Sequence, residues 1–183
     1  MNRLGKMLYG LLVEIVDTVL PALVIAVLIN LFVAQGTYVE GQSMEPNLHT
    51  DQRLIVEKVS YRLHGPQRGD IVVVRLPDHK VPLIKRVIGL PGERVEIREE
   101  RVWVDGQLLD EVYLENIKQR PYGPLTVPDQ HVFVMGDNRN VSGDSRLFGS
   151  VPLANVWGRA WLSYWPLQEI GFLRSDGTLR LFR

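Results

Sequence analysis

The sequence predicts a mostly β protein, with one N-terminal transmembrane helix followed by a mainly antiparallel β domain. Three observations predict this class. An apolar segment without charged residues, Thr18–Ala34, lies near the N-terminus. Short runs rich in β-branched residues follow it and are separated by turn residues, which is typical of strands. At 183 residues, the chain is long enough for one domain and an appendage.

The apolar segment has the length, about 17 residues, of a short helix that crosses a bilayer. Glu14 and Asp17 precede it and are expected in the headgroup region, because a carboxylate is costly in hydrocarbon. Arg3 and Lys6 also precede it, and the next basic residue is Arg53. The positive-inside rule therefore predicts a cytoplasmic N-terminus and an extracytoplasmic domain.

This division gives residues 1–36 as a short cytoplasmic N-terminus with its membrane anchor, and residues 37–183 as an extracytoplasmic β-rich domain. The alternative is a secretory signal peptide removed at the small-x-small site Ala34-Gln35-Gly36. The apolar run exceeds the usual length of the hydrophobic region of a signal peptide, which favours the anchor. An intact N-terminus in the mature protein would decide between the two.

Several short segments predict the strands. Ile71–Val74 is a β-branched run after the turn residues Arg68-Gly69-Asp70, as in a buried strand. Val95–Arg98 alternates with period two, and Asp105-Gly106 predicts a hairpin turn after Val102–Val104. The other segments expected to be extended are Tyr38–Gln42, Leu54–Val59, Leu83–Ile88, His131–Met135 and Val156–Tyr164.

Glu115–Pro128 is predicted to be a surface loop. It lacks periodicity and contains three prolines, which have no N–H to donate to a sheet. No repeat or low-complexity tract occurs elsewhere in the chain.

Composition excludes several classes of function. The formal net charge is zero, which argues against a nucleic-acid binder. The chain has no cysteine, so disulfides, thiolate nucleophiles and cysteine-ligated metals are excluded. Its histidines form no His-Glu-x-x-His pair, so neither a metal nor a cofactor is expected. They are His49, His64, His79 and His131.

Lys85 lies inside an otherwise apolar run. In a strand its side chain shares one face with Val81, Leu83 and Val87. Burial there would lower the pKa of the amine, and a neutral amine can accept a proton from a serine hydroxyl. The alternative, which this pattern alone favours, is an edge lysine whose stem packs while its ammonium reaches water.

Ser43 lies in Gly41-Gln42-Ser43-Met44-Glu45-Pro46, shortly after the apolar segment. Pro46 disfavours a helical conformation at Glu45 and indicates a turn. A serine in such a turn is either a nucleophile paired with a base or a residue that only bonds nearby backbone.

A third stretch, Gly136 to Arg146, is dense in polar groups and directly follows an apolar strand. A calcium loop is excluded, because Phe148 occupies the position that requires a bidentate glutamate. The stretch is either a plain surface loop or a set of hydroxyls and ion pairs that orient a buried lysine.

Together these stretches resemble the bacterial type I signal peptidases, membrane-bound serine–lysine leader peptidases. The resemblance covers nearly the whole chain in order. It rests on the N-terminal anchor and on four motifs, which are Ser43–Pro46, Arg68–Val74, Lys85–Glu93 and Gly136–Arg146.

The resemblance implies a β catalytic domain of signal-peptidase type with Ser43 as nucleophile and Lys85 as general base. It also implies that Ser142 hydrogen-bonds the lysine and that Asp144 and Arg146 form a structural ion pair near the site.

For the oxyanion, the resemblance implies donation by the backbone N–H of Ser43. Some family members add a hydroxyl two residues earlier, where this sequence has Gly41. Losing such a donor costs about 10²–10³ in rate, so a backbone or water substitute is expected.

The implied substrates are signal peptides of exported preproteins, cut after a small-x-small pattern. Shallow apolar pockets explain this preference, and the cleavage segment is expected to bind by β-addition. The residues expected to line the pockets are Val39, Met44, Leu48, Leu83 and Ile84.

The implied location is the bacterial cell membrane, with membrane lipid as a partner. Trp157, Trp161, Tyr164 and Trp165 cluster late in the chain, either at the bilayer interface or packed in the core.

Three rival functions remain to be weighed. A self-cleaving SOS repressor resembles the same peptidase fold, but it requires a DNA-binding helix-turn-helix where this chain has an apolar segment. A mitochondrial inner-membrane peptidase shares overlapping motifs. The third rival is an inactive membrane-tethered β module that binds extended peptides. Peptidase activity that is lost on Ser43→Ala would exclude it.

Overall fold

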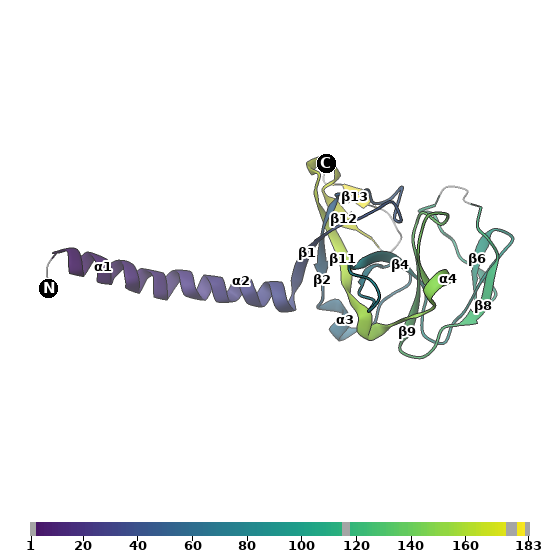
Figure 1. Cartoon of the computed structure of the whole chain (residues 1–183), viewed down its shortest axis with the longest axis horizontal. Coiled ribbons are helices and arrows are strands. Elements are labelled where there is room, and N and C mark those ends of the chain that lie inside the picture. Colours follow the sequence, from purple (N-terminus) through teal and green to yellow (C-terminus); the bar gives the residue numbers. More distant parts are fainter. Residues whose placement is uncertain (1–2, 115–117, 175–178, 182–183) are drawn as a thin grey trace. The chain divides into compact units, whose positions relative to one another are not determined.

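The computed structural model describes residues 3–114, 118–174 and 179–181. It contains two compact units, Met1–Gln35 and Gly36–Arg183. Figure 1 shows that the first unit is helical and that the second is built mainly of strands. This confirms the predicted class, a mostly antiparallel β protein with one apolar N-terminal helix.

The first unit is a helix that begins at Arg3 and ends at Phe32. It consists of α1 (Arg3–Glu14), a π-helical turn η1 (Ile15–Val19) and α2 (Leu20–Phe32). Among the described residues, one stretch of it, Tyr9–Asn30, is long and apolar enough to cross a membrane, with 22 residues and a mean hydropathy of 2.4.

The helix differs from the predicted segment Thr18–Ala34 at both ends. It continues through Glu14 and Asp17, which lie inside the candidate span rather than before it. At the other end, Ala34 is already the first residue of strand β1. The predicted segment begins directly after Asp17 because charged residues set its limit in the sequence. An exposed carboxylate does not interrupt the backbone hydrogen bonds of a helix, so the helix continues through this residue.

The larger sheet has nine strands in the order β1-β2-β11-β3-β4-β9-β10, with β12 pairing β11 and β13 pairing β12. Neighbouring strands from β2 through β9 pair antiparallel. The strands are β1 (Ala34–Tyr38), β2 (Arg53–Glu57), β3 (Ile71–Val74), β4 (Leu83–Gly89), β9 (His131–Met135), β10 (Val151–Pro152), β11 (Val156–Trp165), β12 (Gly171–Leu173) and β13 (Leu179–Leu181).

The smaller sheet has the order β7-β6-β5-β8. Its strands are β5 (Arg94–Arg98), β6 (Arg101–Val104), β7 (Gln107–Leu108) and β8 (Tyr122–Thr126). The predicted hairpin turn at Asp105-Gly106 is confirmed, and both residues have the positive φ, 50° and 76°, that a tight hairpin turn requires.

Strand β8 corrects the prediction of a loop over Glu115–Pro128, of which residues 115–117 lie outside the described residues. β8 contains Gly123 and Pro124 and, among the described strands, pairs with β5 alone, at one edge of the smaller sheet. An edge strand tolerates a proline because one side of its backbone has no strand to bond.

The other predicted strands are found with small changes. Ile71–Val74 and His131–Met135 are confirmed with the same bounds, whereas the extended segment expected at Tyr38–Gln42 belongs to β1 only at Tyr38. The short elements that sequence patterns did not predict are α3 (Ser60–Leu63), α4 (Ser145–Phe148), η2 (Leu153–Asn155), η3 (Leu167–Glu169), β10, β12 and β13.

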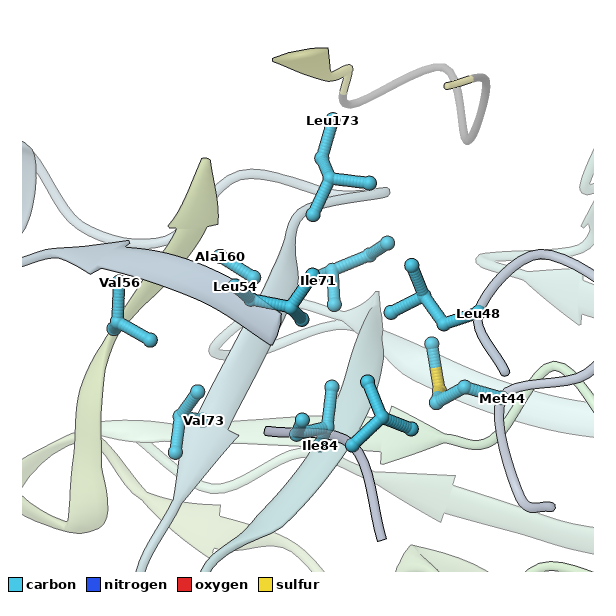
Figure 2. Packing of buried hydrophobic residues seen from close by; sticks show 10 residues of the cluster. Met44, Leu48, Leu54, Val56, Ile71, Val73, Ile84, Ala160 and Leu173 are labelled. Carbon is cyan, nitrogen blue, oxygen red and sulfur yellow. The ribbon is translucent and has the colours of Figure 1, made fainter. Parts of the chain in front are cut away.

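Two of the three buried clusters of the β unit position the segment around Ser43 and join the two sheets. One cluster packs the larger sheet against the segment around Ser43, and Figure 2 shows Met44 and Leu48 among the strand residues Leu54, Ile71 and Ile84. The other joins the two sheets, with side chains from β4 and β9 against side chains from β5 and β6. Burial of such aliphatic side chains stabilises the fold by about 1.5–3 kcal/mol each.

The late aromatic residues separate into two groups. Trp157 packs against the first of these clusters, so it belongs to the core. Trp161, Tyr164 and Trp165 remain 39%, 36% and 48% exposed, respectively, which leaves them available at the surface of the β unit.

Candidate active site

Ser43 lies in a turn that the core anchors from behind. The N–H groups of Asn47 and Leu48 both donate to the carbonyl of Met44, at 3.0 Å. Met44 and Leu48 are completely buried, so their side chains fix the turn to the sheet. Ser43, which directly precedes Met44, is only half-buried. Gly41 has a φ of 77°, a conformation that glycine adopts without strain.

Lys85 reaches Ser43 from strand β4. Its Nζ lies 2.7 Å from the Oγ of Ser43, within hydrogen-bonding distance. β4 is an interior strand between β3 and β9, and Lys85 is only 2% exposed. The edge-lysine alternative, with its ammonium in water, therefore does not describe this side chain.

Burial lowers the pKa of Lys85 to about 8. The carboxylates of Asp144 and Asp137 oppose this shift by favouring the ammonium, and Arg146 adds to it. Removal of water is the larger effect, since a desolvated amine favours its neutral form. A substantial fraction of the amine is thus neutral near pH 8, where it can accept a proton.

Gly136 brings a second loop against Ser43. A Cβ at this position would lie 2.4 Å from the carbonyl oxygen of Ser43 and 2.2 Å from the Oγ of Ser142, so only glycine fits. The N–H of Asn138 donates to the same Ser43 carbonyl at 3.0 Å. The turn that contains Ser43 is therefore held by the loop that follows β9.

Ser142 lies near Ser43 and forms no hydrogen bond with Ser43 or Lys85. Its Oγ is buried and has no hydrogen-bond partner among the described residues. The hydroxyl lies near enough to Asp144 to favour its ionised form, but it forms no hydrogen bond with that carboxylate. The bond from Ser142 to Lys85 that the family resemblance implies is not formed in this arrangement and stays a prediction.

Asp144 and Arg146 form the ion pair that the resemblance implies at these positions, with two contacts of 2.8 Å. Asp144 also caps helix α4 and accepts the N–H of Gly136 at 3.0 Å. Burial raises the pKa of Asp144, but bonding to Arg146 and the N–H of Gly136 outweigh it, and the net pKa is lowered. A fixed negative charge thus lies near Lys85.

Sequence reasoning missed a buried network behind Ser43 and Lys85. Arg86, next to Lys85 but on the opposite face of β4, pairs with Asp137 through contacts of 2.8 and 2.6 Å. Asn47, from the turn that contains Ser43, donates to the same carboxylate and to the carbonyl of Tyr113, at 2.9 Å each. A signal was present, because an arginine in an apolar strand requires a buried anion.

A hollow of about 100 Å³ adjoins Ser43 and Lys85. Leu83 and Ile84, two of the predicted pocket residues, line it together with Glu40, which the sequence did not single out. The other three predicted pocket residues are buried in the core cluster behind the turn and do not line this hollow; they are Val39, Met44 and Leu48.

Gly41 offers no side chain toward an oxyanion. Its carbonyl accepts a hydrogen bond from the hydroxyl of Thr50 at 3.1 Å. This bond fixes the backbone just before Ser43. The N–H of Ser43 is the predicted oxyanion donor. It donates to no backbone carbonyl among the described residues.

Comparison with known proteins identifies the family. The family model described as "Signal peptidase, peptidase S26" matches residues 12–165. The chain is 42% identical to "Signal peptidase I" of Leptolyngbya laminosa, covering 88% of this chain and 84% of that one. It is 42% identical to a Synechocystis protein named "Probable signal peptidase I-2", covering 89% and 78%.

A relative with lower sequence identity carries the same name. "Signal peptidase I" of Bacillus licheniformis is 37% identical, covering 87% of this chain and 91% of that one. A crystal structure of a signal peptidase I from Enterococcus faecalis V583 aligns with 51% of this chain and 95% of its own at 39% identity and a TM-score of 0.47. The chain belongs to the S26 peptidases and is a type I signal peptidase, a serine peptidase that hydrolyses peptide bonds.

Proposed function

We propose that Ser43 is the nucleophile and Lys85 the general base of this peptidase. One observation carries the proposal, namely a 2.7 Å contact between the Ser43 hydroxyl and a lysine that burial holds near a pKa of 8. A base works best when its pKa lies near the working pH, because it is then both available and strong enough.

Each step uses the same pair of side chains. Neutral Lys85 takes the proton of Ser43 as the oxygen attacks the scissile carbonyl, and backbone N–H groups such as that of Ser43 stabilise the oxyanion. The resulting ammonium protonates the leaving amine. Lys85, neutral again, then activates the water that hydrolyses the ester to Ser43.

The substrate we propose is a signal peptide cut after a small-x-small site. The hollow beside Ser43 is lined by Leu83 and Ile84 and is about 100 Å³, which suits a short apolar side chain and excludes larger ones. Val81 and Pro82, just before β4, line the same hollow, and Val81 is exposed, so an extended peptide can lie along this segment by β-addition.

The helix through Tyr9–Asn30 is proposed to anchor the enzyme in the bacterial cell membrane. Arg3 and Lys6 precede it and favour a cytoplasmic N-terminus. The β unit, residues 37–183, is then extracytoplasmic, where signal peptides emerge. The exposed residues Trp161, Tyr164 and Trp165 suit the bilayer interface.

Cleavage of a preprotein in detergent micelles tests the proposal. Wild type, Ser43→Ala and Lys85→Met are compared, and mass spectrometry locates the cut. We expect wild type to cut after a small-x-small site and both variants to be inactive although folded. Activity that survives Ser43→Ala would exclude the dyad, and a folded wild type that leaves the preprotein intact would favour a peptide-binding module.

A further inference from the structure

A second hollow, of about 540 Å³, lies beside the candidate active site. We call it the arginine groove, since Arg120, Arg139 and Arg146 line it together with Tyr122, Ser142 and Leu147. No carboxylate is among the described residues that line it. Its walls come from the Gly136–Arg146 loop and from the start of β8.

The arginine groove begins next to the nucleophile. Ser142 lines the groove, and its Oγ and the carbonyl of Ser43 both press against Gly136, at 2.2 and 2.4 Å from the position of a Cβ there. The groove shares no lining residue with the small hollow at Leu83 and Ile84. The dyad is thus adjoined by two separate hollows of different chemistry.

A substrate extends to both sides of the bond that is cut. An endopeptidase binds residues before and after that bond, so an extended substrate must continue past Ser43. The small hollow at Leu83 and Ile84 suits the residues before the cut. The arginine groove, which is larger and is lined by arginines, is available for residues after it.

Two of the three arginines shape the groove and one remains available to a ligand. Arg139 is 3% exposed and pairs with Glu111, and Arg146 pairs with Asp144. Arg120, in contrast, is exposed, and no hydrogen bond or ion pair joins it to the described part of the chain.

We infer that the arginine groove binds the first residues of the mature protein, and that Arg120 pairs with an acidic side chain there. The inference rests on the proposed function. Because Arg120 is exposed, its ion pair is weakened by water and salt, and we expect an acidic residue to raise kcat/KM about two- to fivefold.

The test varies charge on both partners. Preproteins carry Glu, Gln or Lys at each of the three positions after the cut, and the ratio of kcat/KM for Glu to that for Gln is measured. In wild type this ratio should exceed one at one of these positions and fall toward one in 0.5 M salt or in Arg120→Gln. Arg120→Glu should reverse it and favour Lys.

Arg94→Glu is the matched control, because Arg94 is an exposed arginine at the start of β5 that does not line the groove. Its ratio should equal that of wild type; an equal loss in Arg94→Glu and Arg120→Glu would overturn the inference in favour of net charge. The same holds if wild type cuts the Gln substrate normally but gains nothing from Glu at any position. Failure to cut the Gln substrate would instead overturn the proposed function, and the groove assignment with it.

Discussion

Two adjacent basic residues lie on opposite faces of strand β4 and have different partners. Lys85 and Arg86 are both almost completely buried, at 2% and 0% exposure. Arg86 meets a carboxylate, Asp137, through two short hydrogen bonds, and its third nitrogen donates to the carbonyl of Gly69 at 2.9 Å. Lys85 meets a neutral hydroxyl instead.

The difference lies in what replaces the lost water. Burial without an anion in contact lowers the pKa of an amine, whereas a guanidinium with a bidentate partner keeps its charge. One face of β4 therefore holds a group that can exchange a proton, and the other holds a permanently charged one. The proposed base and the buried ion pair beside it are adjacent residues in the sequence.

Removal of Lys85 should cause the largest loss of rate, and it should increase the stability of the folded protein. Loss of a general base costs about 10²–10⁴ in kcat, so Lys85→Met should be essentially inactive. Below pH 8 the buried ammonium destabilises the native state, by up to about 3 kcal/mol for a pKa lowered from 10.5 to about 8. Lys85→Met should therefore unfold at higher denaturant concentration than wild type at pH 7.

The stabilisation by Lys85→Met should depend on pH. Between about 8 and 10.5 the unfolded chain binds the lysine proton and the native protein does not, so wild-type stability rises with pH in this window. The gap between the two proteins should close by pH 10.5. Urea unfolding at pH 7 and pH 10 measures it, and a gap independent of pH would contradict a lowered pKa.

Removal of Arg86 should act mainly on stability. Arg86→Met leaves the carboxylate of Asp137 buried without its partner, which costs about 3–5 kcal/mol. The double variant Arg86→Met/Asp137→Leu is the control and should recover much of the loss in a thermal melt. Equal losses in the single and double variants would mean that the pair is less tightly coupled than its geometry indicates.

Asn47 should show a smaller effect that joins the two faces. Asn47→Ala removes two hydrogen bonds that tie the turn containing Ser43 to Asp137 and Tyr113, at a cost of about 1–3 kcal/mol. We expect kcat to fall more than KM rises, because Ser43 would be less well placed against Lys85. Steady-state kinetics on one preprotein measures this, with Thr50→Val as a control that loosens the same turn from its exposed side.

The smallest effect concerns the pH dependence of activity. Wild-type kcat/KM should rise with pH through about 8, as Lys85 loses its proton. Asp144 favours the charged lysine, so Asp144→Asn should move this rise to lower pH while still allowing a cap at α4. A profile that moves to higher pH would show that Asp144 acts on Lys85 in another way.

Much of this architecture was predictable from local patterns. The runs at Ile71–Val74 and His131–Met135 specify strands by composition, and alternation in β4 placed Lys85 among aliphatic neighbours. β8 was not predictable, since its proline is acceptable only at a sheet edge, and edges are set by tertiary pairing.

The site was predictable in its residue types but not in its contacts. Nothing local says that Lys85 reaches Ser43 across 42 positions, or that Asp137 chooses Arg86 across 51. Ser142 illustrates the limit, because the motif names the residue while the position of its hydroxyl depends on how the loop packs at Gly136. The burial of Met44 and Leu48 likewise depends on tertiary packing against strands distant in the sequence.

The lowered pKa of Lys85 makes this amine chemically distinct from every solvated lysine of a cell surface. At pH 8 an ordinary lysine is almost entirely an ammonium and reacts with electrophiles only through its small neutral fraction, while about half of Lys85 is a free amine. The hollow at Leu83 and Ile84 leads directly to it. A short peptide with an amine-selective warhead would thus find, in one place, both its binding pocket and its reactive partner.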